Sequence, residues 1–512
     1  MGREMQAVEL VDVHTSRWSE SPAGGPGPDG PPGLWRALVG GVARAGRTLW
    51  RHRDRWPLLA GAVVVLAVVW TGVRVVQWRH EQAYLATLVG LPDVVAPIDG
   101  GAQVRWTAQV DELGQVPSWL QAGDLLIGTG LGATGPHIVA LQADTGEVSW
   151  RWPRDEDGSG GAPGMPWCIA ASGAALLCWS GASEGEDTED LGDDRRTLLV
   201  LDAVTGADLR APVEVRGHAQ LVAVGADAVL VRTERDGSVE VVRYDVATWS
   251  PRWSRTLPAR LAGGDAAAQV DGWPSVLVEG ERVAVEAAAV GVVLLDAADG
   301  AVTTTVAPAG GTQWLVQGAD GTGFAVRFDD GAALETSTLD GSFTRPGYWV
   351  PPPMDDGSLG TVLVDLDMLG NPAVPSLDVA RVGAAGWSAD GVGMVRNAAV
   401  LDHRLLALTE DELTVFDGED GDRLWTVPVE APTVGLEGTA QLSTQVLTDG
   451  REVLVVPGPT GRGDDGPVLQ AYSLADGRPT WRIDLPDDAA QVSGVGGRLL
   501  VQTSGGRLVH LG

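Results

Sequence analysis

The sequence has no lysine, only two cysteines, and only four tyrosines and four phenylalanines among its 512 residues. Its 36 basic residues are all arginine and face 68 acidic residues, for a formal net charge of −32. Residues 81–512 hold 26 of the arginines and 62 of the acids. Nucleic-acid affinity depends on basic groups that displace counterions, so this composition argues against a nucleic-acid partner. The acidity suits a large solvated surface, with binding of cations or of a basic partner as the alternative.

Clusters of chemically active side chains are missing too. The seven histidines are scattered without an H-x-x-x-H spacing, and there is no G-x-S-x-G nucleophile elbow. The acidic stretch from Glu184 to Asp194 lacks the ligand spacing of a calcium loop. The stretch Asp417–Asp422 is explained by a hairpin turn of the repeat rather than by a cation site. We therefore predict no catalytic residue, no metal site and no cofactor, and we expect that the protein is not an enzyme.

Glycine, proline and short apolar runs are abundant instead. The chain contains 70 glycines and 31 prolines, and runs of Val, Leu and Ala alternate with Asp-Gly and Thr-Gly turns. Long amphipathic helices are hard to find. Short alternating segments separated by glycine-containing turns are typical of an all-β protein.

A strand–turn–strand unit recurs along the distal part of the chain. An alternating apolar strand leads into a turn that ends in Gly, and the second strand often ends in Trp. Seven copies are recognisable: Ile138–Trp150, Leu198–Arg210, Val241–Trp253, Val292–Thr304, Ala333–Arg345, Leu413–Trp425 and Leu469–Trp481. Glycine supplies the positive φ of a tight hairpin, and tryptophan is expected to fill the gap between neighbouring sheets. Repetition of this kind predicts a β-propeller.

The repeat resembles that of the pyrroloquinoline-quinone-type propellers, including the outer-membrane assembly lipoprotein family, over approximately residues 96–512. The positions that carry the resemblance form the predicted repeat signature: Thr145, Gly146, Trp150, Asp202, Thr205, Gly206, Asp417, Gly421 and Trp425. The departures are Gln142 and Ser473 in place of Asp, Trp249 in place of Gly, and Arg210, Thr304 and Arg345 in place of Trp. The resemblance implies a role like that of the lipoproteins, which act as scaffolds for envelope assembly machinery.

The two ends of the propeller are expected to pair. Arg507–Gly512 has the form of a hairpin strand without its partner, and Gln103–Val110 has the form of the missing outer strand. Their pairing would remove exposed sheet edges and close the ring. This joint blade and the seven hairpins predict eight four-stranded blades. Thr361–Pro372, between the turns at Gly341 and Gly421, is either a degenerate hairpin or an inserted loop, so seven and nine blades remain alternatives.

An uncharged run of 17 residues, Pro57–Val73, precedes the propeller. A spanning helix needs about 20 mostly apolar residues, so we predict one transmembrane helix over 57–78. Trp56, Trp70 and Trp78 suit its interfacial belts. A cleaved signal peptide is the alternative, but 56 residues precede the run and no cleavage site follows it. Arginines between residues 44 and 55 predict a cytoplasmic N-terminus, and thus an extracytoplasmic propeller at the plasma membrane.

The predicted domain order follows from these segments. A disordered cytoplasmic tail (1–33) leads to a basic juxtamembrane segment (34–56), the transmembrane helix (57–78), an extracytoplasmic stalk (79–95) and the propeller (96–512).

Cys168 and Cys178 flank a hairpin centred on Gly173, which would set them opposite each other on adjacent strands. We predict a structural disulfide, in keeping with an oxidising exterior. Two free buried thiols or a metal pair are the alternatives.

Three functions remain open at this point. The first is a membrane-anchored, non-enzymatic scaffold that binds protein or cell-envelope partners. The second is an extracytoplasmic ligand sensor that signals through the single helix. The third is a degenerate quinoprotein dehydrogenase, although that family has neighbouring cysteines beside its cofactor whereas the cysteines here stand ten positions apart.

Overall fold

The structure is a computed structural model that divides into two compact units, Met1–Glu81 and Gln82–Gly512. It describes residues 56–98, 102–114, 118–132, 135–153, 166–171, 175–181, 195–234, 236–259, 273–287, 290–307, 312–318, 321–329, 332–365, 376–409, 411–429, 446–456 and 467–512. The predicted tail, nearly all of the juxtamembrane segment, Gly173 and the acidic stretch Glu184–Asp194 lie outside the described residues.

One long helix, α2 (Trp56–Leu88), contains the predicted transmembrane segment. Several apolar side chains along it are exposed: Val68, Val69, Trp70, Val73, Val75, Val76 and Trp78. Within the described residues, however, no helix is both long and apolar enough to cross a membrane. The structure therefore gives no support to the predicted transmembrane helix.

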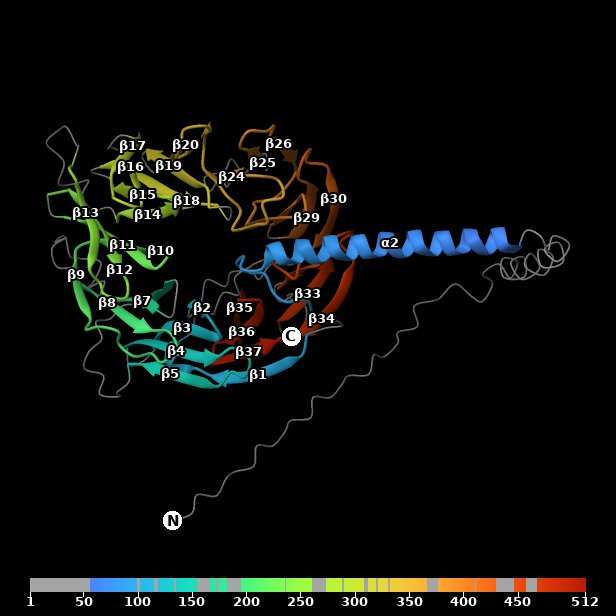
Figure 1. Ribbon diagram of the computed structural model, residues 1–512, viewed down its shortest axis with the longest axis horizontal. Helices are drawn as coiled ribbons and strands as arrows, with labels where there is room; N and C mark the ends of the chain where they lie inside the picture. The colour runs from blue at the N-terminus through green and yellow to red at the C-terminus, as the bar shows by residue number, and fades with distance from the viewer. Residues whose placement is uncertain are drawn as a thin grey trace, which may run out of the picture. The chain divides into compact units, whose positions relative to one another are not determined.

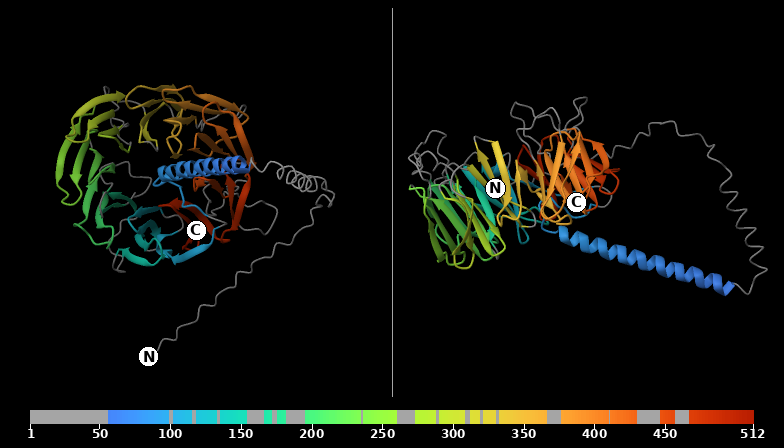
Figure 2. Two further views of the ribbon diagram at one scale, coloured as in Figure 1. Left: turned by 45° about the vertical axis from the view of Figure 1, so that its right-hand side comes forward. Right: turned by 90° about the horizontal axis from the view of Figure 1, so that it is seen from above.

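The second unit is a ring of nine sheets, which are the blades of a propeller (Figure 1; Figure 2, left). Eight sheets have four strands and one has five. The first strands of neighbouring blades contact one another, so they form the inner wall of the ring. We number the blades I to IX in the chain order of these inner strands.

The strands of blades I to IV are β2 (Ser118–Ala122), β3 (Leu125–Gly132), β4 (Gly135–Gln142), β5 (Val148–Trp152); β6 (Trp167–Ala171), β7 (Ala175–Gly181), β8 (Arg195–Asp202), β9 (Val213–Arg216); β10 (Ala219–Val224), β11 (Asp227–Thr233), β12 (Val239–Asp245), β13 (Pro251–Leu257); and β14 (Ser275–Glu279), β15 (Arg282–Ala287), β16 (Gly291–Asp296), β17 (Val302–Ala307).

The strands of blades V to VII are β18 (Thr312–Gln317), β19 (Gly323–Asp329), β20 (Ala332–Thr338), β21 (Thr344–Pro346); β22 (Trp349–Val350), β24 (Val362–Asp365), β25 (Ser376–Arg381), β26 (Trp387–Asp390); and β23 (Met354–Asp355), β27 (Asn397–Leu401), β28 (Arg404–Leu408), β29 (Glu412–Asp417), β30 (Arg423–Pro428). Those of blades VIII and IX are β31 (Leu447–Thr448), β32 (Glu452–Val455), β33 (Val468–Ser473), β34 (Pro479–Asp484); and β35 (Ala489–Val495), β36 (Arg498–Thr503), β37 (Arg507–Leu511), β1 (Val104–Gln109). A short 3₁₀ helix, η2 (Asp111–Leu113), follows β1.

The count of nine corrects the prediction of eight. The additional blade is blade VI, which occupies the gap between the turns at Gly341 and Gly421. Part of Thr361–Pro372 forms its second strand, β24, rather than an inserted loop. The hairpin that ends at Trp387 was missed because its turn has neither Asp nor Thr before Gly383.

The predicted closure of the ring is confirmed. β1 pairs antiparallel with β37, from Val104 opposite Leu511 to Gln109 opposite Arg507 (Figure 1, blue beside red). The first and last strands of the propeller thus share blade IX.

Each blade contains four antiparallel strands, to which blade VII adds β23 as a parallel strand beside β27. The first and third turns of the four antiparallel strands therefore lie at the same end of the ring. We call this end the turn face and the opposite end the loop face; Figure 2 (right) shows the blades from the side. Most of the first turns use residues of positive φ, as tight hairpins require: Gly123 (60°), Gly225 (60°), Gly280 (59°), Asp402 (50°), His403 (60°), Gly450 (85°), Gly496 (55°) and Gly497 (77°).

Candidate functional site

Tryptophans fasten neighbouring blades together at the turn face. The indole ring lies 2.5 to 2.7 Å from where a Cβ would stand on the third-turn glycine of the next blade. Its Nε1 donates a hydrogen bond to a carbonyl of the same turn. We call this arrangement the latch. Five interfaces have it: Trp106 with Gly146 and Ala143 O (3.1 Å), Trp150 with Gly206 and Ala203 O (3.0 Å), Trp253 with Gly300 and Ala297 O (2.9 Å), Trp387 with Gly421 and Gly418 O (3.1 Å), and Trp425 with Gly477 and Leu474 O (3.2 Å).

The predicted signature residues build these latches. The Asp202 carboxylate accepts hydrogen bonds from the backbone N–H groups of Val204 and Thr205 and from the Thr205 hydroxyl, which lower its pKa. Asp417 accepts one from Glu419 N. These bonds shape the turn, and the glycine then leaves room for the incoming ring. The signature residues therefore hold neighbouring blades together, and they do not indicate where the protein binds a partner.

At the interface between blades II and III, the large aromatic residue occupies the glycine position of the latch instead of the tryptophan position. Arg210 stands where the latch has Trp, and Trp249 stands where it has Gly, with a φ of 51°. The Arg210 guanidinium lies 5.5 Å from the centroid of the Trp249 ring, which also stacks on Tyr244 at 4.5 Å. Two departures that look independent in the sequence are thus one cation–π contact across the interface.

Two successive interfaces, between blades IV and V and between V and VI, have no latch. Thr304 and Arg345 occupy the Trp positions. A Cβ on either Gly341 or Gly383, the corresponding turn glycines, would meet nothing within 4 Å. Arg345 lies instead over Trp349, 4.7 Å from its centroid.

A buried carboxyl lies at the first of these two interfaces. Glu286 is 4% exposed and shares one face of β15 with Ala284, which packs toward blade V. Burial raises the pKa of Glu286 to about 8, against the opposing effect of a hydrogen bond from Ser275 N. Such a side chain weakens this interface when it ionises.

No latch is seen among the described residues between blades VIII and IX, where the third and fourth strands of blade IX, β37 and β1, are not consecutive in the chain. Trp481 instead donates to Glu452 in its own blade, at 2.6 Å. The chain before β1 fills the gap: Val95, Ile98 and Ala102 are buried in a shared core with the strands of both blades.

The backbone of this preceding segment is also bound to the turn face. Val95 N donates to Thr448 O (2.8 Å), Ala96 N donates to Gly497 O (2.6 Å), and Thr448 N donates to Asp93 O (3.2 Å). Residues 82–95, predicted to be part of a stalk, thus belong to the same compact unit as the blades.

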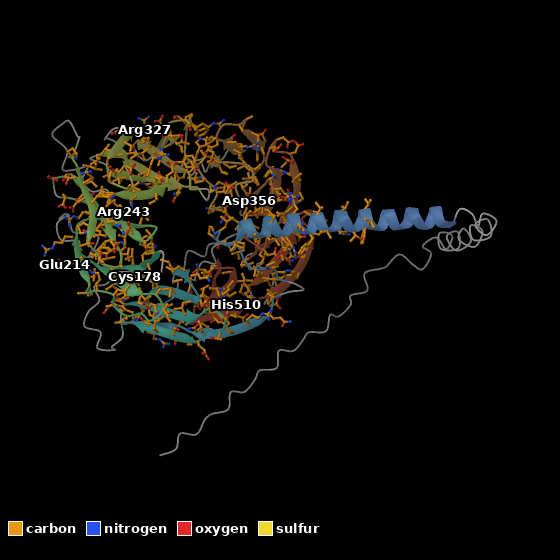
Figure 3. The ribbon with its side chains drawn as sticks, in the orientation of Figure 1. Cys178, Glu214, Arg243, Arg327, Asp356 and His510 are labelled. Atoms are coloured by element: carbon orange, nitrogen blue, oxygen red, sulfur yellow. A yellow bond between two sulfur atoms is a disulfide. The ribbon has the colours of Figure 1, made fainter. Side chains whose placement is uncertain are left out.

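The last turn of α2 continues this attachment. Leu88 is 1% exposed and packs with Met354 and the cores of blades VII and VIII. Gly450 leaves room for Leu85 and Leu88, whose atoms lie 2.5 and 2.7 Å from its missing Cβ. Burial and the nearby carboxylates of Asp356 and Asp402 raise the pKa of Tyr84 above its usual range. Figure 3 shows Asp356 beside this end of the helix.

Asp356 has a structural role as well. The segment that contains it and β23 crosses from blade VI to the first turn of blade VII. Asp402 N donates to the Asp356 carboxylate (2.6 Å), and His403 N donates to the Ser358 hydroxyl (2.8 Å). These bonds hold two non-glycine residues at positive φ.

The structure contains the predicted disulfide. Cys168 and Cys178 are directly opposite each other on β6 and β7, and their sulfurs are bonded. Both are buried in blade II, where Figure 3 labels Cys178.

Two exposed tryptophans of the propeller lie at the loop face. Trp167 and Trp273 are 47% and 40% exposed, and each lies at or just before the start of an inner strand, whereas Trp314, 48% exposed, is the third residue of β18. Trp273 bridges two blades there: it stacks on His218 at 4.5 Å, and the Arg196 guanidinium lies 3.8 Å from its centroid. Tryptophan is enriched in protein interfaces, so this inner rim of the loop face is the candidate binding surface. The sequence could not predict this surface, because it does not show which tryptophans are exposed and which are buried in latches.

Metal-binding clusters are not found in the described residues, where no three His, Cys, Asp or Glu side chains come together in a suitable arrangement.

Comparison with known proteins gives one family match. The family described as "Outer membrane protein assembly factor BamB" matches residues 374–512. No curated protein matches the chain. Among solved structures, BamB from Moraxella catarrhalis is similar with 13% identity over 80% of this chain and 99% of that one, at a TM-score of 0.41. Quinohemoprotein alcohol dehydrogenase from Comamonas testosteroni is similar with 12% identity over 84% of this chain and 79% of that one, at a TM-score of 0.38. The family match supports a propeller of the pyrroloquinoline-quinone-like type.

Proposed function

We propose that the protein is a non-enzymatic scaffold that binds protein or cell-envelope partners through the loop face of its propeller. The match of residues 374–512 to a family named for an assembly factor carries this proposal. The exposed Trp167 and Trp273 support the choice of face, because large aromatic side chains often dominate the energy of protein interfaces.

We further propose that the propeller lies outside the cytoplasm and that α2 anchors it at the plasma membrane. The disulfide between Cys168 and Cys178 supports an oxidising compartment. The uncharged run Pro57–Val73 and the exposed apolar side chains that follow it on α2 support an anchor. The arginines that precede the run support a cytoplasmic N-terminus.

The test is crosslinking of the full-length protein in its native host, followed by mass spectrometry of the proteins that co-purify. A variant without the propeller identifies partners that depend on it. Trp167→Ala should reduce the recovery of those partners, whereas Val204→Ser, an exposed apolar side chain on the turn face of the same blade, should not. Absence of any propeller-dependent protein would contradict the scaffold proposal.

A sensor is the second candidate, and the attachment of α2 to the blades favours it. Because Leu85 and Leu88 pack beside Gly450, a rearrangement of blades VII and VIII on ligand binding would reach the helix directly. Deletion of residues 1–33 separates the two functions: a scaffold should tolerate the deletion, and a transducer should not.

A further inference from the structure

The last strand of each blade lies at the edge of its sheet, and an exposed edge can pair with a strand of another molecule. Charged residues and proline on edge strands prevent such pairing. Eight of the nine outer strands carry at least one charged residue: Arg105 in β1, Arg151 in β5, Glu214 and Arg216 in β9, Arg252 and Arg255 in β13, Arg345 in β21, Asp390 in β26, Arg423 in β30, and Arg482 and Asp484 in β34. The remaining strand, β17, has the sequence VTTTVA and contains neither charge nor proline.

β17 is also accessible and only weakly attached to the next blade. Its residues 302–305 are exposed, and Val302 is 49% exposed. Thr304 replaces the latch tryptophan, so no indole ring ties this strand to blade V. Valine and threonine favour extended structure. The sequence stays uncharged from Gly300 to Ala319. The nearest charge at the beginning of the strand is the Arg255 guanidinium of blade III, which donates to Gly300 O (3.0 Å) in the preceding turn.

The charge of the protein determines what can pair with this edge. Residues 81–512 hold 62 acidic residues and 26 arginines, so two copies of the chain repel each other over most of their surface. Like charges directly opposite on paired strands are destabilising. Among the outer edges, β17 allows two copies to meet without bringing like charges face to face.

We propose that β17 pairs antiparallel with β17 of a second copy of this chain. The contact would be isologous about a two-fold axis and would join the two four-stranded sheets of blade IV into one continuous sheet. Pairing of β17 with β16 is irregular between Thr305 and Ala307 and between Val302 and Thr304. The regular stretch between these irregularities is Thr304–Thr305, so the two-fold axis should lie there. One short strand makes few hydrogen bonds, so we expect a weak, concentration-dependent dimer.

The test is a cysteine scan along β17 in the full-length protein. The sequence has two cysteines and both are in the disulfide, so an introduced cysteine is the one free thiol. Single variants from Val302→Cys to Val306→Cys are oxidised and analysed on non-reducing gels. Disulfide-linked dimer should peak at position 304 or 305 and fall at least several-fold at 302 and 306. Thr107→Cys, exposed on β1 beside Arg105, is the matched control and should give little dimer.

Analytical ultracentrifugation provides an independent readout. Thr304→Glu should raise the dissociation constant at least tenfold, while Thr107→Glu should leave it unchanged. A flat crosslinking profile, a monomer at all concentrations, or crosslinks to a different protein would each overturn the proposal. These outcomes leave the scaffold proposal untouched, because the partners of the scaffold are expected at the loop face.

Discussion

The interface between blades III and IV and the interface between blades IV and V flank the same sheet, yet they are built differently. At the first, Trp253 forms a latch with Gly300, and the core contains 13 buried residues among those described. At the second, Thr304 faces an open turn, the described core has six buried residues, and Glu286 is buried beside it. The described core of the next interface, between blades V and VI, has four buried residues. A propeller can thus keep its ring shape over an arc whose interfaces are much weaker than the rest, because neighbouring latches on both sides hold the blades in place.

Removal of one latch should have the largest effect. Trp150→Ala deletes a buried ring and its hydrogen bond to Ala203 O, and we expect a loss of about 3 to 5 kcal/mol in the free energy of unfolding. Thr304→Ala, at the equivalent position of the unlatched interface, should cost under about 0.5 kcal/mol. Urea denaturation of both variants measures the difference. Similar losses would show that the latch contributes little.

The second-largest effect on stability is expected from the ionisation of Glu286 at the interface between blades IV and V, which has no latch. Its folded-state pKa of about 8 exceeds the ordinary 4.5, so folding favours the protonated form. The stabilising effect of protonated Glu286 is fully present below about pH 4.5 and is lost as pH rises through 8. At pH 7 the free energy of unfolding should be about 3 kcal/mol lower than at low pH. Glu286→Gln should match the wild type below about pH 4.5 and exceed it increasingly up to pH 8. Denaturation curves across this range test the prediction, and equal pH slopes for the two proteins would refute it.

The reversed contact between Arg210 and Trp249 should be convertible into a latch. Arg210→Ala should cost about 1 kcal/mol. Arg210→Trp alone places a ring against the Trp249 side chain and should cost more. Adding Trp249→Gly restores the usual pair, so the double variant should be at least as stable as the wild type. A double-mutant cycle measures the coupling, and simple additivity would mean that the two positions do not interact.

The smallest effect on stability is expected at the seam, the pairing of β1 with β37 that closes the ring. Burial, with Arg498 and Arg105 nearby, lowers the pKa of His510 to about 4, and its ring lies 5.2 Å from that of Trp106. The folded state holds this histidine neutral, so the stability it contributes is present above about pH 6.5 and is lost as pH falls towards 4. His510→Gln should reduce the drop in Tm between pH 7 and pH 5 by about 1 to 2 °C. An unchanged drop would show that the seam does not sense this proton.

Much of the ring was predictable from local sequence, because several hairpins have a turn glycine and a tryptophan four positions later, and that tryptophan packs on the turn glycine of the next blade. Gly146 and Trp150 show this spacing, and so do Gly383 and Trp387. Blade VI was not predicted because the turn before Trp387 contains neither Asp nor Thr.

Other features depend on contacts that a sequence does not reveal. Arg210 and Trp249 each looked like a simple departure from the repeat until the structure showed them in contact. Glu286 lies in an alternating strand whose two faces are both buried, so the pattern cannot mark it as a buried acid. Val94 and Val95 pair only through isolated bridges to Thr448 and Gly497, far away in the sequence, so the stalk looked free.

The attachment of the stalk has a mechanical consequence. A pulling force on α2 would reach Leu88 first and then the hydrogen bonds of Val95 and Ala96 at the turns of blades VIII and IX. The second of these bonds reaches the first turn of blade IX, the blade that β37 and β1 complete. The load would therefore be shared between the beginning and the end of the chain, and the ring would tend to be held as a whole rather than unravelled from its first strand.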